Sequence, residues 1–169
     1  MKHLTKAVLL VAGLTLAACT NADRFGDDYG SSSASQTAAI TPGSASDPAS
    51  PLYFQQSVGD RVLFLVDQSS LTDTARYTLD GQVAWLNANP DYSAVIEGHA
   101  DEQGTREYNL ALGARRANAV REYLITSGVA GNRLRTVSYG KERPIEICSE
   151  EACYAKNRRA VTTLAAGNS

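Results

Sequence analysis

The chain has 169 residues, of which 43% are hydrophobic and 20% are charged, a composition typical of a folded globular domain. Lys and Arg number 16 against 18 Asp and Glu, which gives a formal net charge of −2. General nucleic-acid binders carry a basic excess that neutralises phosphates, so this class is excluded and no nucleic-acid partner is expected. Only two histidines are present, which excludes mechanisms that need several imidazoles.

The N-terminus has the pattern of a secretory leader. Lys2 and Lys6 precede a short apolar run over residues 7–16. A bilayer-spanning helix needs about 20 apolar residues, so this run is too short to span a membrane comfortably. We therefore expect residues 1–18 to be a signal peptide; the alternative is a buried hydrophobic helix.

The segment Leu16-Ala17-Ala18-Cys19 resembles a bacterial lipobox. In such a motif the cysteine thiol is the lipid acceptor and the leader is cut before it, so we expect Cys19 to be lipidated. Several acyl chains make release from a membrane very slow. Thr20 stands where an Asp would resemble an inner-membrane retention signal, which predicts an outer-membrane lipoprotein facing the periplasm. The alternative is an ordinary secretory cut near Ala18 that leaves Cys19 as an odd thiol.

Residues 19–51 are predicted to form a flexible tether behind the lipid. This stretch is rich in Ser, Ala, Gly and Pro and has too few large apolar side chains to offset its ordering entropy. A coil of ~30 residues has an r.m.s. reach of about 30 Å. The folded domain is then expected over residues 52–165, with a short tail at 166–169.

The domain is predicted to be an α/β sandwich, with helices on one face of a small mixed sheet. The expected order is βαβαββ: a buried strand at 61–66, a helix between Thr72 and Asn89, a strand at 93–98, a helix at 107–127, and strands at 134–140 and 160–164. The apolar stripe of the long helix is expected to consist of Leu110, Ala114, Ala117, Val120 and Leu124.

Three polar residues are expected to meet at one small space. Asp101 follows the end of a predicted strand, and Asn109 and Arg116 lie seven residues apart, so they share one flank of the following helix. A carboxylate facing a guanidinium suits a zwitterionic ligand, because the first accepts an ammonium and the second grips a carboxylate through two N–H groups. The alternative is a plain Asp–Arg ion pair, or solvated charges on a helix face.

The segment from Gly98 to Val120, together with residues 137–144 and 157–159, closely resembles the peptidoglycan-associated lipoproteins, a group within the family of outer-membrane-protein-A-like C-terminal domains. The resemblance covers residues 61–164 and implies non-covalent binding of the diaminopimelate-containing stem peptide of peptidoglycan. It also implies contacts with the periplasmic Tol proteins, TolB above all and TolA in addition.

The resemblance implies a role for each matching site residue. Asp101 would take the side-chain amine of diaminopimelate and Arg116 its carboxylate. The remaining implied site residues are Thr105 and Asn109, which would support the pocket, and Asp67 and Arg158, which would close its rim. Val66 stands where many members carry an aromatic residue, and Ala100 replaces a commoner Thr.

Cys148 and Cys153 are expected to form a disulfide in an oxidising periplasm. The alternative is a metal site, but two thiols and His99 fall short of four ligands.

His99 could act as a general base, although a histidine after a buried strand more often satisfies its ring nitrogens locally. We expect no metal, cofactor or catalytic residue: no metalloprotease helix or phosphate loop occurs, and residues 136–140 only half-resemble a nucleophile elbow.

The sequence thus predicts a non-catalytic anchor that links the outer membrane to the cell wall and supports envelope integrity and constriction during division. A second hypothesis is a protein–protein interaction module for Tol proteins with incidental wall binding. A third is a wall hydrolase that uses His99 or paired acids.

Overall fold

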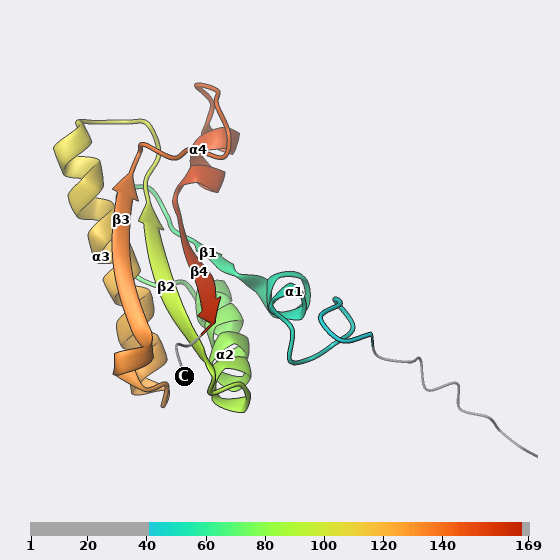
Figure 1. The fold of residues 1–169 in the computed structure, drawn as a ribbon. Coiled ribbons are helices and arrows are strands. Elements are labelled where there is room, and N and C mark those ends of the chain that lie inside the picture. Colours follow the sequence, from blue (N-terminus) through green and yellow to red (C-terminus); the bar gives the residue numbers. More distant parts are fainter. Residues whose placement is uncertain (1–40, 167–169) are drawn as a thin grey trace, which may run out of the picture. The chain divides into compact units, whose positions relative to one another are not determined.

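The computed structural model describes residues 41–166 (Figure 1). The predicted leader, Cys19, most of the predicted tether and the last three residues lie outside this range. Within the described part, no helix is long and apolar enough to cross a bilayer.

Four strands form one mixed sheet in the order β1-β4-β2-β3 (Figure 1). The strands are β1 Arg61–Leu63, β2 Tyr92–His99, β3 Leu134–Gly140 and β4 Arg159–Ala166. β2 pairs in parallel with β3 and antiparallel with β4, and β4 pairs antiparallel with β1. The last strand is therefore inserted between the first two.

Two long helices cover one face of this sheet, α2 Asp73–Ala88 and α3 Arg106–Thr126 (Figure 1). Thr72 and Thr105 cap their N-termini, each accepting a hydrogen bond from the backbone N–H three residues on. The core between the two layers includes Phe54, Leu79, Leu86, Ile96, Val120 and Leu124. The predicted fold class is confirmed.

Short helices that the sequence did not predict surround this frame. They are α1 Pro51–Tyr53, the π-helical turn η1 Phe54–Gly59, the 3-10 turn η2 Gly131–Arg133 and α4 Glu151–Asn157. α4 lies between β3 and β4, so the βαβαββ order gains a helix before its last strand. Seven residues are too few to show helical periodicity, because they make only two turns.

The first strand is shorter than the predicted 61–66 and is not buried throughout. After Leu63 the chain makes one more bond, from Phe64 N to Arg158 O at 2.9 Å, and then turns away. Leu65 and Val66 are more than half exposed. Two hydrogen bonds to the carbonyl of Leu65 stabilise this turn, one from the backbone N–H of Gln68 and one from the side chain of Arg116.

The folded unit begins before the expected boundary at Leu52. The indole of Trp85 donates to the carbonyl of Pro48 at 2.7 Å, and Ser50 is buried. The ring of Phe54 packs 4.9 Å from that of Trp85. The last residues assigned to the tether are therefore part of the folded unit.

The predicted apolar stripe of α3 is buried at Ala117, Val120 and Leu124, whereas Ala114 is half-buried and Leu110 is 44% exposed. The buried residues of α3 are Asn109, Leu112, Gly113, Arg116, Ala117, Val120 and Leu124. Two glycines let α3 approach β2 closely: a Cβ on Gly98 would lie 1.8 Å from the carbonyl oxygen of Gly113. The first half of α3 thus lies directly against the end of β2.

Candidate functional site

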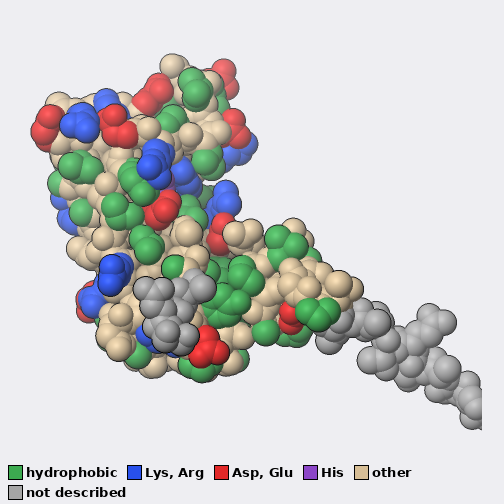
Figure 2. Space-filling model, viewed as in Figure 1, with side chains coloured by type: hydrophobic (Ala, Val, Ile, Leu, Met, Phe, Trp, Pro, Cys, Tyr) green, Lys and Arg blue, Asp and Glu red, His purple; other side chains and the backbone are tan. Residues whose placement is uncertain are grey.

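A cleft of about 240 Å³ opens beyond the C-terminal end of β2. Its lining residues are Val66, Asp67, Asp101, Gln103, Gly104, Tyr108, Asn109 and Leu112. Figure 2 shows acidic and basic side chains interspersed at the end of the molecule that carries α4. Three of the six predicted ligand-binding residues, Asp67, Asp101 and Asn109, therefore share one cleft.

Asp101 lies at the base of this cleft and is 7% exposed. Its Oδ1 accepts from the backbone N–H of Gln103 at 3.2 Å, and its Oδ2 accepts from Nη1 of Arg158 at 3.1 Å. A carboxylate has about four lone-pair sites, so acceptor capacity remains for a ligand.

Arg158 is buried beside Asp101 and does not line the cleft. Burial disfavours its charge, but hydrogen bonds to Glu151 and Asp101 outweigh this and raise the pKa of its guanidinium. It also donates from Nε to the carbonyl of Phe64 at 3.3 Å. Arg158 thus joins the cleft carboxylate to α4 and to the chain after β1.

Arg116 is placed differently from the prediction that it lines the space around Asp101. It is fully buried, and its three nitrogens donate to the carbonyls of Gln68 at 2.8 Å, His99 at 2.8 Å and Leu65 at 3.2 Å. Burial lowers the pKa of Arg116 to about 10, against the opposing attraction of Asp101, so it stays charged at neutral pH. Arg116 therefore holds the loop at 65–68 and puts a positive charge behind the cleft.

Asn109 and Thr105 support the cleft from the start of α3. Asn109 is 1% exposed, and its Nδ2 donates to the carbonyl of Gln103 at 2.7 Å. Thr105 caps the helix and is not among the lining residues. Both hold the loop that follows Asp101, so their contacts are those of supporting residues.

Asp67 forms one edge of the cleft together with a residue that the sequence analysis missed. It has a positive φ of 57° and accepts a hydrogen bond from the hydroxyl of Tyr108. Tyr108 lines the cleft and is 44% exposed. The only sequence signal for Tyr108 is its place one residue before Asn109.

His99 differs from the expectation that its ring nitrogens are satisfied locally. The ring is 2% exposed, yet among the described residues neither nitrogen has a hydrogen-bond partner, and Glu97 is 3.6 Å from Nε2. Burial, followed by the charges of Arg159 and Arg143, lowers the pKa of His99 to about 4. The ring is therefore neutral at neutral pH and lies outside the cleft.

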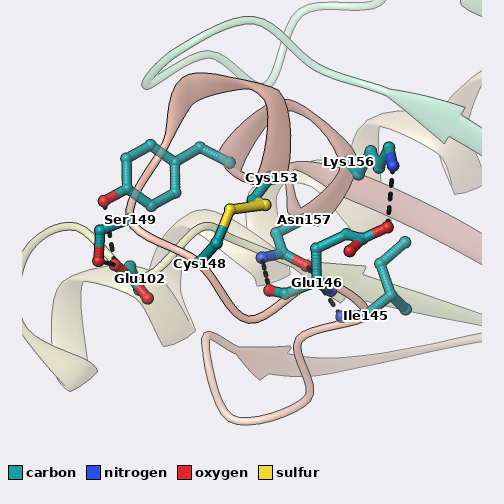
Figure 3. The surroundings of a disulfide bond; sticks show 9 residues. Glu102, Ile145, Glu146, Cys148, Ser149, Cys153, Lys156 and Asn157 are labelled. Atoms are coloured by element: carbon teal, nitrogen blue, oxygen red, sulfur yellow. Dashed lines mark hydrogen bonds and ion pairs between the residues drawn. A yellow bond between two sulfur atoms is a disulfide. The ribbon is translucent and has the colours of Figure 1, made fainter.

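The structure joins Cys148 and Cys153 in a disulfide next to α4 (Figure 3). No group of three or more His, Cys, Asp or Glu suited to a metal ion occurs within residues 41–166. The sequence analysis missed Glu151, in the first turn of α4, which pairs with Arg158.

A larger cavity of about 400 Å³ lies apart from the Asp101 cleft and shares no lining residue with it. It is lined by β1, the start of α2, Ile145 and Lys156. Its charged lining residues, Arg61 and Lys156, are both basic, and most of its other lining residues are apolar. No acidic residue lines it, so it lacks the group that the ammonium of a zwitterion needs. We therefore place the candidate site at Asp101.

The OmpA family model matches residues 63–158, which include every cleft-lining residue. The chain belongs to the OmpA family, among its peptidoglycan-associated lipoproteins. A protein named peptidoglycan-associated lipoprotein from Rhizobium meliloti is 49% identical over 162 residues, covering 96% of this chain and 88% of the relative.

Solved structures agree with this membership. The crystal structure of the peptidoglycan-associated lipoprotein from Burkholderia pseudomallei is 39% identical, with a TM-score of 0.64, and covers 72% of this chain and 98% of that one. The crystal structure of the C-terminal domain of Helicobacter pylori MotB is 21% identical, with a TM-score of 0.60. The match covers 64% of this chain and 86% of the MotB chain, and it shows a shared fold.

Proposed function

We propose that this protein is a non-catalytic anchor that binds peptidoglycan through the diaminopimelate of the stem peptide. The observation that carries the proposal is the cleft around Asp101, a nearly buried carboxylate with two buried guanidinium groups close by. The name shared by the relatives, peptidoglycan-associated lipoprotein, supports the same ligand class.

The charges of the cleft fit the free end of diaminopimelate, which carries an ammonium and a carboxylate on one carbon. Asp101 accepts the ammonium with its remaining lone pairs. Arg116 and Arg158 attract the carboxylate from behind the cleft, and Arg116 uses only three of its five N–H groups on backbone carbonyls. Both attractions act in partly desolvated surroundings, where they exceed those of an exposed pair.

We also propose that Cys19 is lipidated after removal of residues 1–18 and anchors the protein in the outer membrane with its domain in the periplasm. In this arrangement the protein connects the outer membrane to the wall as part of the Tol–Pal system and supports constriction during division. The lipobox and the membership of a lipoprotein group support the anchor.

Contact with Tol proteins, TolB first, is proposed at the rim of the same cleft. Val66 and Tyr108 line the cleft, and together with the neighbouring Leu65 they expose between 44% and 55% of their surface. Contiguous exposed apolar side chains of this kind mark sites of protein–protein contact. A partner at this rim would cover the cleft. We therefore expect soluble TolB to displace a bound stem peptide.

Sedimentation with purified sacculi tests wall binding. The full chain in detergent is compared with Asp101→Asn, which removes the charge but keeps the shape, and with Asp91→Asn. Asp91 is exposed and lies just before β2, whereas Asp101 lies just after it, so the control makes the same charge change at the opposite end of the strand.

We expect Asp101→Asn to bind about tenfold more weakly, the usual effect of losing a charge-assisted hydrogen bond. Asp91→Asn should sediment like the unmodified chain, and circular dichroism should be native for both. Equal sedimentation of Asp101→Asn and the unmodified chain would rule out this cleft. Release of muropeptides from the sacculi would contradict the non-catalytic role.

A further inference from the structure

The disulfide between Cys148 and Cys153 ties the first turn of α4 to the segment that precedes it (Figure 3). This segment also touches the residue next to Asp101, because Ser149 Oγ donates to Glu102 Oε1 at 3.3 Å. Tyr154 of α4 donates to the same carboxylate at 3.0 Å. The bridge thus belongs to a unit, residues 148–154, that contacts the loop carrying Asp101.

The C-terminal end of α4 has its own anchors. Asn157 is 2% exposed, and its Oδ1 accepts from the backbone N–H groups of Ile145 at 2.9 Å and Glu146 at 3.2 Å. Its Nδ2 donates to the carbonyl of Glu146 at 2.8 Å (Figure 3). This end is therefore held without the bridge.

The N-terminal end of α4 depends more on the bridge. The N-cap residue, Glu150, makes no side-chain capping bond, and the helix has only 7 residues, too few to be stable in isolation. The bonds of Ser149 and Tyr154 to Glu102 are exposed to water and are individually weak. The covalent link at Cys153 is the strongest restraint on this turn.

Glu151, the first residue of that turn, bonds the guanidinium of Arg158 through both carboxylate oxygens. The Nη1 that donates to Glu151 at 3.4 Å also donates to Asp101 at 3.1 Å. The side chain of Arg158 is 5% exposed and that of Glu151 is 66% exposed, so Glu151 covers a guanidinium that water would reach if Glu151 moved away. The position of Glu151 therefore affects the orientation of the Arg158 guanidinium relative to the carboxylate of Asp101.

We propose that Glu151 is a positioning residue for Arg158 and that the Cys148–Cys153 bridge fixes it, so that the redox state of the bridge sets the ligand affinity of the Asp101 cleft. The statement on affinity rests on the proposed binding function. A dithiol supplies the two electrons and two protons: the S–S bond breaks, both cysteines become thiols, and the dithiol closes to its own disulfide.

The test uses the full chain in detergent, oxidised or reduced with dithiothreitol, and the double variant Cys148→Ser/Cys153→Ser. Glu151→Gln removes the charge that faces Arg158. Glu150→Gln is the matched control, because it makes the same change one residue away on a side chain without a hydrogen bond to Arg158. Binding of a diaminopimelate-containing muropeptide is measured by titration, and the guanidinium NMR signals of Arg158 are recorded without ligand.

Reduction, the double serine variant and Glu151→Gln should each weaken binding about three- to tenfold and shift the Arg158 signals. Glu150→Gln should behave like the unmodified chain. Reduction should have little further effect on Glu151→Gln, since the two changes act on one contact. A purely structural role of the bridge would instead leave Glu151→Gln as redox-sensitive as the unmodified chain.

Equal affinities and equal Arg158 signals in the oxidised and reduced chains would overturn the inference. Binding in neither state would overturn the proposed function and the affinity statement together. In that case the ligand-free NMR signals still decide whether Glu151 positions Arg158.

Discussion

Arg116 shows how a fully buried charge is used at the cleft. Three backbone carbonyls surround its guanidinium, and two of them, those of Leu65 and Gln68, belong to the turn that precedes α2. A carbonyl left without a donor in such a place costs about 1–3 kcal/mol. The planar guanidinium, with N–H groups that point in several directions, is therefore needed to bond all three carbonyls, and its positive charge alone would not suffice.

The substitution Arg116→Lys should lower the free energy of unfolding by about 2–4 kcal/mol, because one ammonium cannot reach three carbonyls in different directions. The measurement is urea unfolding followed by circular dichroism. Arg115→Lys is the control, because Arg115 is the next residue of α3 and is exposed. This substitution should change the free energy of unfolding by less than about 0.5 kcal/mol. Equal effects of the two substitutions would contradict the role assigned to Arg116.

His99 gives the protein a specific dependence on pH. Its pKa is about 4 in the folded state and about 6.5 for a histidine in water, so between these values the unfolded chain binds more protons. The contribution of His99 to stability is complete above about pH 6.5 and is lost as the pH falls toward 4, by up to about 3 kcal/mol. The neighbouring charged groups are Glu97, Arg143 and Arg159.

The side chain introduced by His99→Phe cannot bind a proton. The free energy of unfolding of this variant should therefore fall less steeply from pH 6.5 to pH 4 than that of the unmodified chain. Urea midpoints measured across this range give the two slopes, and their difference removes the contribution of the carboxylates that titrate in both proteins. Parallel slopes would show that the buried ring does not resist protonation.

The sequence predicted which polar residues gather but not all of their contacts. The seven-residue spacing of Asn109 and Arg116 placed both on one face of α3, near Asp101. It could not show that Arg116 reaches the carbonyl of Gln68, 48 residues earlier in the chain. Every residue has a carbonyl, so such a partner leaves no signal in side-chain types.

At the scale of elements, the approach of α3 to β2 decides where the cleft lies. Gly98 and Gly113 face each other so closely that neither has room for a side chain. This contact brings the start of α3, with Asn109, against the loop after β2. Any group inserted there would push the helix away from the cleft.

Gly98→Ala should therefore lower the free energy of unfolding by about 3 kcal/mol or more, because the added Cβ would meet the backbone oxygen of Gly113 and the backbone cannot yield as a flexible side chain does. Gly81→Ala, in α2, is the control. Its Cβ would meet only the side chain of Val58 at 3.4 Å, so it should raise stability by up to about 1 kcal/mol. Urea unfolding measures both, and a Gly98→Ala protein as stable as the unmodified chain would refute the close contact.

Elements with long-range partners were the hardest to predict. The long helices followed from their periodicity and caps, whereas the run at 61–66 was wrongly expected to be one buried strand. Apolar composition indicated a strand there, but the end of β1 depends on Arg116, which is distant in sequence. α4 was missed because its seven residues show no helical periodicity; the bonds of Asn157 to residues 145–146 and the disulfide to Cys148 hold it in place.

At the scale of the whole molecule, the proposed function needs two attachments: a lipid anchor at Cys19 and a binding cleft in the folded domain. Only a chain attached at both ends can connect two layers of an envelope. In the proposed arrangement Cys19 carries every acyl chain of the anchor, so we expect membrane attachment to depend on this one cysteine.

Cys19→Ser should release the protein from the outer-membrane fraction into the soluble periplasmic fraction. Fractionation with immunoblotting measures this shift, and Thr20→Ala is the control that keeps the acceptor thiol. Continued sedimentation of Cys19→Ser with membranes after the wall has been digested would show that another segment provides the anchor.

The central claim is that the Asp101 cleft recognises the zwitterionic end of diaminopimelate. Calorimetric titration of the full chain with two stem peptides that differ only in carrying diaminopimelate or lysine tests it most directly, because lysine keeps the ammonium and lacks the carboxylate. We predict that the lysine peptide binds about tenfold more weakly and that Asp101→Asn weakens binding of the diaminopimelate peptide by a similar factor. Equal affinity for both peptides, or no affinity for either, would contradict the account.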